Sequence, residues 1–304
     1  MVIYIYSMKI AVTGANSSVG QNLLEQLKNE PEIKITAGVR SERAFSGLPK
    51  SMTIDPHIIA YDDPASLETA MADADCVVHL AGILIEAKNS NYASANVAAT
   101  AAVVQAAMKS SVKHLIFISV VGASKNSSNA YFRSKGSAEQ LIKESGLTAS
   151  ILRTPILLGP GAAGASAIMG LASAGQTKVL GGGKYCMRPL DIDDLSTAII
   201  QICKNPPDGQ VTHELVGPES MTYRDIIKKT AELMGKTVEI GSVPIVIAKI
   251  GSAIASTLKG GGMTPTVIDV ITKDEVVQTN ADKAIGITLT PLEDTLKKII
   301  NTGN

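Results

Sequence analysis

The feature of this chain that most restricts its fold is a regular alternation in its first half. Short runs rich in β-branched residues alternate with longer stretches of helical periodicity. Nearly continuous apolar runs of this length are typical of strands buried on both faces of a parallel sheet. We therefore predict an α/β fold of the Rossmann type, with a doubly wound parallel sheet. The expected strands are residues 9–13, 34–39, 57–61, 76–82, 114–119 and 149–153, and the expected helices are 20–29, 64–72, 93–109 and 130–145.

The stretch "AVTGANSSVGQNLLEQL" has the composition of a phosphate-binding turn. Gly14 directly follows the first expected strand, and Gly20 is expected to open the helix. The first glycine permits a tight turn, the last allows close packing of helix on sheet, and the helix N-terminus offers free N–H groups to a pyrophosphate. Ser17 stands where a third glycine is usual, and its hydroxyl could donate to a phosphate oxygen. We predict a dinucleotide held by Gly14, Ser17, Ser18, Val19 and Gly20; the alternative is a strand–helix turn with incidental glycines.

The end of the second expected strand indicates which dinucleotide the chain binds. It reads "AGVRSER" and carries no acid at its tip, where a carboxylate would bind an adenosine ribose. Arg40 stands there instead, with Glu42 and Arg43 nearby, and a guanidinium suits a 2′-phosphate. The sequence therefore favours NADP over NAD as the cofactor, although two solvated surface arginines would give the same pattern.

Tyr131 and Lys135 are the most informative polar pair in the chain. They lie four residues apart in the expected helix 130–145, which places both side chains on one face. Free tyrosine has a pKa of about 10 and is a weak acid–base group at neutral pH. A nearby ammonium favours the phenolate and lowers that pKa. The pair predicts a proton-transfer site, although this spacing also arises by chance on amphipathic helices.

The composition of the chain changes after Pro155, where glycine and alanine dominate residues 159–176. We predict that residues 1–155 form the dinucleotide-binding domain, with strands returning to it from about 176–216. Residues 156–304 are expected to form a smaller, partly interleaved α/β lobe that binds the substrate, with a hinge at 260–262.

Bulk composition narrows the possible partners. Lysine and arginine total 28, as do aspartate and glutamate, and there is no tryptophan, so nucleic acid is not an expected partner. The cysteines form no CxxC pair, so we predict no metal site and a reduced, cytoplasmic setting. No transmembrane segment is expected. Residues 243–258 are interpreted as a partly buried helix, with membrane-surface contact as the alternative. The apolar residues 1–7 are interpreted as an extended N-terminus, with Met8 as an alternative start.

Several motifs together carry a family resemblance. They are "TGANSSVG", "HLAG", "NVAATAAVVQAA", "HLIFISVVGAS", "YFRSK", "ILRTPILLGPG" and "RPLDIDDL". In their order and spacing the chain resembles a short-chain dehydrogenase/reductase of the extended or atypical type. With "MTPTVIDVITKDEVV" it looks most like the NmrA- and epimerase-related subgroup that includes the NADPH-binding accessory subunit of respiratory complex I.

The resemblance implies roles for further residues. It makes Tyr131 and Lys135 the catalytic pair, with Ser119 as their partner. The implied cofactor contacts beyond the glycine loop are Asp62 near the adenine, Ala81 and Gly82 after the fourth strand, Lys135, and Pro155 beside the nicotinamide. The implied substrate contacts are Asn96 and Arg188, Arg188 having a structural pairing with Asp193 or Asp194 as its alternative.

Two departures from the family pattern leave the function open. Ser17 replaces a glycine, and Ser119 is followed by Val120 where relatives often have a second serine. We therefore expect an NADP-dependent oxidoreductase acting on a carbonyl, alcohol or quinone-like small molecule. The alternatives are a nucleotide-sugar epimerase or dehydratase using bound NAD, and a non-catalytic NADPH-binding subunit or redox sensor. A homodimer or peripheral association with a larger complex fits these readings.

Overall fold

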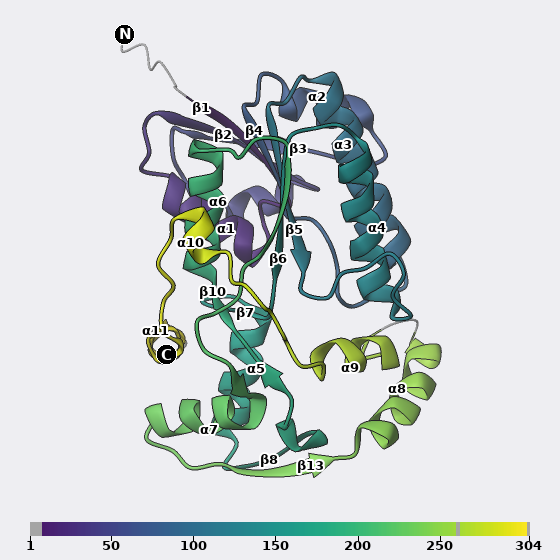
Figure 1. Ribbon diagram of the computed structural model, residues 1–304, viewed down its shortest axis with the longest axis vertical. Coiled ribbons are helices and arrows are strands. Elements are labelled where there is room, and N and C mark those ends of the chain that lie inside the picture. The colour runs from purple at the N-terminus through teal and green to yellow at the C-terminus, as the bar shows by residue number, and fades with distance from the viewer. Residues whose placement is uncertain (1–7, 260–261, 303–304) are drawn as a thin grey trace.

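The computed structural model describes residues 8–259 and 262–302. The expected extended N-terminus lies outside these residues, as does most of the expected hinge. The centre of the structure is a seven-stranded sheet in the order β11-β6-β5-β4-β1-β2-β3, in which every neighbouring pair is parallel (Figure 1). The predicted doubly wound α/β fold is thus confirmed. The strands are β1 (Met8–Thr13), β2 (Ile33–Val39), β3 (Ile54–Ile58), β4 (Cys76–His79), β5 (His114–Val120), β6 (Ala149–Thr154) and β11 (Gln210–Glu214).

The third strand lies three residues earlier than predicted. The predicted strand 57–61 begins directly after Pro56, a residue that cannot donate a ladder hydrogen bond. In the structure Pro56 lies within β3, which forms the edge of the sheet and pairs with β2 alone. A proline is tolerated there because one side of an edge strand needs no donor. Residues 59–61 consequently leave the sheet and enter the connection that follows it.

Helices cover both faces of the sheet (Figure 1). On one face, α1 and α6 bury Leu23, Leu27 and Ile199 against the strands. On the other, α2, α3 and α4 bury Leu67 and Ile142, among others. The helices are α1 (Ser18–Leu27), α2 (Pro64–Met71), α3 (Ala99–Lys109), α4 (Ala130–Glu144) and α6 (Ile192–Lys204), with short helical turns η1 (Glu42–Gly47) and η2 (Ala93–Ala98).

A smaller part of the chain lies beyond the carboxyl ends of the strands (Figure 1). Its core packs α5, α7 and α11 together through residues such as Ile168, Ile226 and Leu296. Residues 176–180 pair here with β13, so of the region expected to return to the main sheet, β11 does so and β8 does not. The elements are β7 (Leu157–Leu158), α5 (Ala163–Ser173), β8 (Gln176–Leu180), η3 (Gly181–Gly183), β9 (Cys186–Met187), β10 (Leu190–Asp191), β12 (Met221–Thr222), α7 (Tyr223–Leu233), β13 (Glu239–Val243), α8 (Ile245–Lys259), α9 (Pro265–Ile271), α10 (Asp282–Ile285) and α11 (Leu292–Thr302).

Helix α8 is more exposed than the sequence suggested. It packs against α9, and Lys249 forms an ion pair with Asp269. Its outward face leaves four aliphatic side chains between 60% and 69% exposed: Val246, Ile247, Ile250 and Ile254. Within residues 8–259 and 262–302, no helix has both the length and the apolar character needed to cross a bilayer.

Candidate cofactor cleft and proton-transfer site

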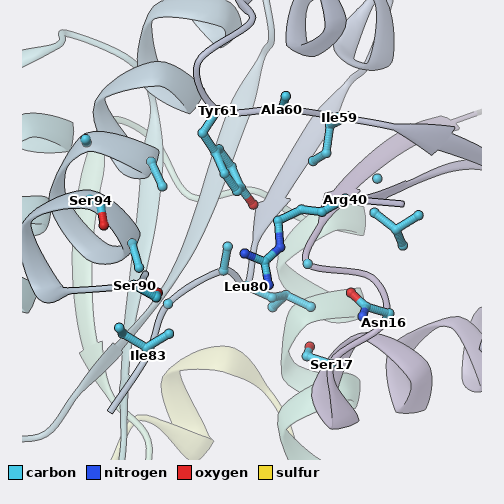
Figure 2. A pocket seen from close by; sticks show the side chains of 18 of the residues that line it. Asn16, Ser17, Arg40, Ile59, Ala60, Tyr61, Leu80, Ile83, Ser90 and Ser94 are labelled. Carbon is cyan, nitrogen blue, oxygen red and sulfur yellow. The ribbon is translucent and has the colours of Figure 1, made fainter. Parts of the chain in front are cut away.

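A cleft of about 680 Å³ opens at the carboxyl ends of β1 to β4. It lies where α/β sheets of this topology bind their ligands, because the loops there diverge on either side of the central strand. Figure 2 shows side chains from four successive loops lining it. The lining residues are Gly14, Asn16, Ser17, Gly38, Val39, Arg40, Ile59, Ala60, Tyr61, Asp62, Leu80, Ala81, Gly82, Ile83, Asn89, Ser90, Ser94, Ala95, Ala98 and Ala99.

The glycine loop forms the floor of the cleft. Gly14 has φ of +77°, and a Cβ there would lie 3.1 Å from the Ala81 nitrogen. A Cβ on Gly20 would lie 2.5 Å from the Ala15 carbonyl oxygen. Both positions therefore require glycine, the first for its conformation and its closeness to the loop after β4, the second for helix packing.

Ser17 is compatible with this loop because its backbone is ordinary. Its φ of −69° and ψ of 162° are accessible to any residue, so a side chain costs no strain. Ser17 is the N-cap of α1, and its Oγ accepts a hydrogen bond from the Gly20 N–H at 3.1 Å. The helix consequently begins at Ser18, earlier than expected, followed by Val19, which packs against the core. The hydroxyl proton of Ser17 remains able to point into the cleft.

Arg40 and Tyr61 occupy the side of the cleft opposite the glycine loop. Arg40 follows β2, and Figure 2 shows its guanidinium extending into the cleft between Tyr61 and Asn16. Burial raises the pKa of Tyr61, an effect opposed by its hydrogen bond with Thr13 and by the charge of Arg40. Asp62 is exposed at the same rim, whereas Arg43 lies on the exposed turn η1. Tyr61 and Asn16 also line the cleft, although no motif of the sequence indicated them; both lie next to motif positions.

Lys135 lies next to Gly82, behind the surface that lines the cleft. Its side chain is 5% exposed, and its ammonium donates to the Ile118 carbonyl at 2.7 Å and lies 4.1 Å from the Phe117 ring centroid. A Cβ on Gly82, which lines the cleft, would be 3.6 Å from Lys135 Nζ. Burial lowers the pKa of Lys135 to about 7, although the Glu139 carboxylate acts in the opposite direction. The charge of this lysine is therefore sensitive to what fills the cleft.

The lowered pKa of Lys135 predicts a pH-dependent stability. Between pH about 7 and the ordinary lysine pKa of 10.5, the unfolded chain holds a proton on this lysine that the folded chain has released. The free energy of unfolding of the cofactor-free protein should therefore increase as pH rises through this window. Urea unfolding at pH 7 and pH 9 measures the rise, which should be smaller in Lys135→Met and unchanged in the surface control Lys109→Met. An equal rise in all three proteins would contradict the prediction.

Tyr131 is the second residue of α4, one turn before Lys135, and is half-buried. Its ring packs at 5.8 Å between centroids against both Tyr92 and Phe132. Burial, and to a lesser degree Tyr92, raises the pKa of Tyr131. This is opposite to the lowering expected from the four-residue spacing, because Lys135 directs its ammonium to a backbone carbonyl and itself loses charge by burial. In the cofactor-free protein Tyr131 is therefore a neutral phenol, which is the form that gives a proton.

Comparison with known protein families now adds to this geometry. A family described as NAD(P)H-binding matches residues 14–179, more than half of the chain. This chain belongs to that NAD(P)H-binding family. The match begins at Gly14 and includes the whole cleft and the Tyr131–Lys135 pair.

Individual relatives are distant. Ceramide reductase of Caulobacter vibrioides is 21% identical over 231 residues, which cover 74% of this chain and 70% of the relative. Mitochondrial NADH dehydrogenase (ubiquinone) 1 alpha subcomplex subunit 9 of Arabidopsis thaliana is 26% identical over 262 residues, 80% of this chain. The match spans 62% of that subunit, less than two thirds of its length.

Solved structures agree on the fold. The dTDP-glucose 4,6-dehydratase of Bacillus anthracis, solved in complex with NAD, superposes with a TM-score of 0.74 at 15% identity, covering 98% of this chain and 96% of that chain. Together with the family match and the relatives, this confirms the expected place among the atypical short-chain dehydrogenases/reductases.

Within this family framework, Ser119 lies among polar side chains of the protein itself. Its hydroxyl is buried and donates to Glu139 Oε1 at 2.6 Å. The same carboxylate accepts from Arg153 Nε at 2.9 Å and Nη2 at 2.7 Å. Ser119 therefore belongs to a buried polar cluster between β5, β6 and α4, and the catalytic role that the resemblance implies for it stays a prediction. Sequence reasoning missed Glu139 because its partners come from two strands on either side of it in the chain.

The side chain of Asn96 also forms hydrogen bonds that hold neighbouring segments together. It lies fully buried in η2, where a π-helical turn precedes α3. Its amide Oδ1 accepts from the Ile83 N–H at 2.8 Å, and its Nδ2 donates to the Ile83 carbonyl and to Ser134 Oγ. Asn96 thereby ties the loop after β4 to α4, and the expectation that it contacts substrate stays a prediction.

Arg188 and Pro155 lie near the junction with the smaller lobe. Arg188 Nε donates to the Gly217 carbonyl at 3.1 Å and Nη2 to the Pro218 carbonyl at 3.3 Å. These contacts differ from the alternative of a pairing with Asp193 or Asp194, since Asp193 accepts from Lys298 and Asp194 from Thr290. The implied contact of Arg188 with substrate stays a prediction. Pro155 is buried directly after β6.

A carboxylate from the C-terminal third holds this junction together. Glu275 accepts from the N–H groups of Ile156 at 3.3 Å and Arg188 at 2.7 Å. Burial raises its pKa, opposed by those two hydrogen bonds. No motif of the sequence pointed to Glu275, since its partners lie about 90 and 120 residues away in the chain.

One buried histidine supports the floor of the site. His79 Nδ1 shares a hydrogen bond with Thr13 Oγ1 at 2.7 Å, Nε2 shares one with Thr100 Oγ1 at 3.1 Å, and the ring stacks on Phe117. Burial lowers its pKa to about 3, so it is neutral at physiological pH. Its role is therefore to join β1, β4 and α3 beneath the cleft.

Proposed function

We propose that this protein is an NADP-dependent oxidoreductase that reduces a carbonyl or quinone-like small molecule, or oxidises the corresponding alcohol. The observation that carries the proposal is the placement of Lys135 next to Gly82, a residue that lines the cleft, with Tyr131 one turn away on the same helix. A family of NAD(P)H-binding proteins and a relative named as a reductase support it.

The residues of the cleft fit a dinucleotide. Gly14 and Gly20 leave no space for side chains and so bring backbone to the cleft floor, while the first turn of α1 offers N–H groups to a pyrophosphate. Arg40 would bind a 2′-phosphate, with Asp62 and Tyr61 near the adenosine and Ala81 and Gly82 along the opposite wall. When bound, the cofactor supplies or accepts the hydride.

The protein itself would contribute the proton, which Tyr131 would donate to the substrate oxygen. Tyr131 is a neutral phenol in the cofactor-free state, as a general acid must be before it gives a proton to a substrate oxygen. Once the proton has left, the Lys135 ammonium would stabilise the phenolate. Raising the negative charge in the cleft would also return Lys135 to its protonated form, since its pKa is already near neutrality.

A second function is favoured by a specific observation. Ser119 is withdrawn into the Glu139 cluster, so the proton-transfer group consists of Tyr131 and Lys135 without it. The Arabidopsis relative is by its name a subunit of an NADH dehydrogenase, which fits a chain that binds NADPH within a larger assembly. A nucleotide-sugar epimerase or dehydratase using NAD is the third reading, consistent with the Bacillus anthracis neighbour.

Cofactor choice gives the first test. Arg40→Ala should weaken NADPH binding by about 10- to 150-fold, the value of one charge-assisted contact, and leave NADH binding nearly unchanged. Isothermal titration of both dinucleotides against both proteins measures this, and Arg43→Ala serves as the matched control on the adjacent exposed turn. Equal affinities of the unaltered protein for NADPH and NADH would remove the basis for NADP.

Activity gives the second test. NADPH oxidation should be followed with a panel of quinones, aldehydes and ketones. Turnover with any of them supports the oxidoreductase. Tight NADPH binding with no turnover across the panel would favour the binding subunit instead.

A further inference from the structure

Two cysteines that are distant in the chain meet in the core. Cys76 is the first residue of β4, and Cys203 lies in the last turn of α6. Their sulfur atoms are 3.2 Å apart, with the Cys203 thiol donating to Cys76 Sγ. Both side chains are buried, at 1% and 5% exposure, within the core cluster that joins the sheet to α1 and α6.

We propose that Cys76 and Cys203 are a redox-sensitive pair that closes to a disulfide when the protein meets a hydroperoxide. The bond needs a sulfur–sulfur distance of about 2.05 Å, so the two atoms have to approach by about 1.2 Å. A small rotation of either side chain provides such a movement. The proposal is independent of the function assigned to the cleft.

The chemistry balances with hydrogen peroxide as the oxidant. The Cys203 thiolate attacks one peroxide oxygen, the O–O bond breaks, and sulfenic acid and water form. The Cys76 sulfur then attacks the Cys203 sulfur and displaces the hydroxyl as a second water. Two thiols lose two electrons and two protons, and one peroxide becomes two waters.

Access sets the rate of this reaction. The hydrogen bond from Cys203, together with burial, raises the pKa of the Cys76 thiol, so thiolate is scarce at Cys76 in the folded protein. Cys203 is one residue from the exposed end of α6, where Lys204, Asn205 and Pro206 face solvent. Fraying of this last helical turn would expose Cys203 first, which makes it the residue that meets the oxidant.

The cross-link should stabilise the fold and spare the cleft. It joins residues 127 apart in sequence and so restricts the unfolded chain strongly. Cys76 lies at the start of β4, whereas the cleft lies beyond its end at Leu80 and Ala81. Oxidation should therefore raise the melting temperature while NADPH affinity stays the same.

The test uses the full-length Cys186→Ser protein, which keeps the pair alone. After hydrogen peroxide treatment, mass spectrometry without reductant should show the loss of two hydrogen atoms and a peptide linking Cys76 to Cys203. The melting temperature should rise by about 5 °C or more and return to its former value with dithiothreitol. Cys203→Ala and Cys76→Ala in the same background should show neither the link nor the rise.

Three results would overturn the proposal. One is that both thiols remain titratable in denaturant after oxidation that is complete for a small-molecule dithiol. Another is a gain of oxygen, from sulfinic acid, without the linked peptide. The third is a linked protein that melts at a lower temperature than the reduced one. Since the readouts are mass and melting temperature, they stay informative whether or not the cleft binds NADPH.

Discussion

Gly14→Val should weaken dinucleotide binding at least about 100-fold. Gly14 has φ of +77°, and its missing side chain would lie 3.1 Å from the Ala81 nitrogen and 3.3 Å from the Leu80 carbonyl carbon. Those backbone atoms belong to the loop after β4, which lines the cleft beside the glycine loop. A branched side chain at this point both strains the turn and separates the two loops, so the cofactor loses its closest backbone approach.

A variant at a second glycine distinguishes the effect of backbone strain from the effect of blocking the cofactor's approach. Gly146, at the end of α4, has the same φ of +77° but no heavy atom within 4 Å of the position of its Cβ. Gly146→Val should therefore suffer the conformational strain and retain binding. Titration with NADPH, together with circular dichroism of each variant, distinguishes the two effects. Full binding by a folded Gly14→Val protein would mean that this loop is not the phosphate site.

Ser17→Gly completes the comparison at the loop. Because Ser17 has ordinary backbone angles, glycine there relieves no strain, and losing the cap costs only a few tenths of a kcal/mol. Any marked loss of NADPH affinity in this variant would then report a contact between the hydroxyl and phosphate.

Much of the fold could be predicted from the sequence because its signals are local. Buried parallel strands are continuous apolar runs, and the glycine loop lies between the first of them and α1. The bounds of β3 could not be predicted in the same way. A strand that contains Pro56 is tolerated at the edge of a sheet, and edge position is a property of the whole sheet.

The details of the site depend on partners that are distant in sequence. Ser119 donates a hydrogen bond to Glu139 on the next helix, and Glu139 also accepts one from Arg153 on the strand that follows. Spacing on a helix correctly indicated that Tyr131 and Lys135 share α4, but it could not indicate that burial would control both pKa values. Desolvation is set by packing around the pair, which no local pattern encodes.

Tyr131→Phe should lower turnover by about 10²- to 10⁴-fold, the usual contribution of a general acid. Phenylalanine keeps the ring contacts with Tyr92 and Phe132, so the fold and the NADPH affinity should change little. The measurement is kcat for whichever carbonyl or quinone substrate the NADPH screen identifies. Tyr223→Phe, on α7 in the smaller lobe, is the matched control and should keep the original rate.

The pH dependence shows whether the loss arises from the proton. Since Tyr131 is held as a neutral phenol, reduction should proceed across the neutral range and decline where the phenol or Lys135 loses its proton in the cofactor complex. In Tyr131→Phe the pH profile of the residual rate should no longer show the decline that ionisation of Tyr131 causes. Lys135→Met should lower both kcat and NADPH affinity, because one ammonium serves the phenol and the cofactor. Turnover by Tyr131→Phe at the original rate would show that another group gives the proton, and Lys135 would then be a cofactor ligand alone.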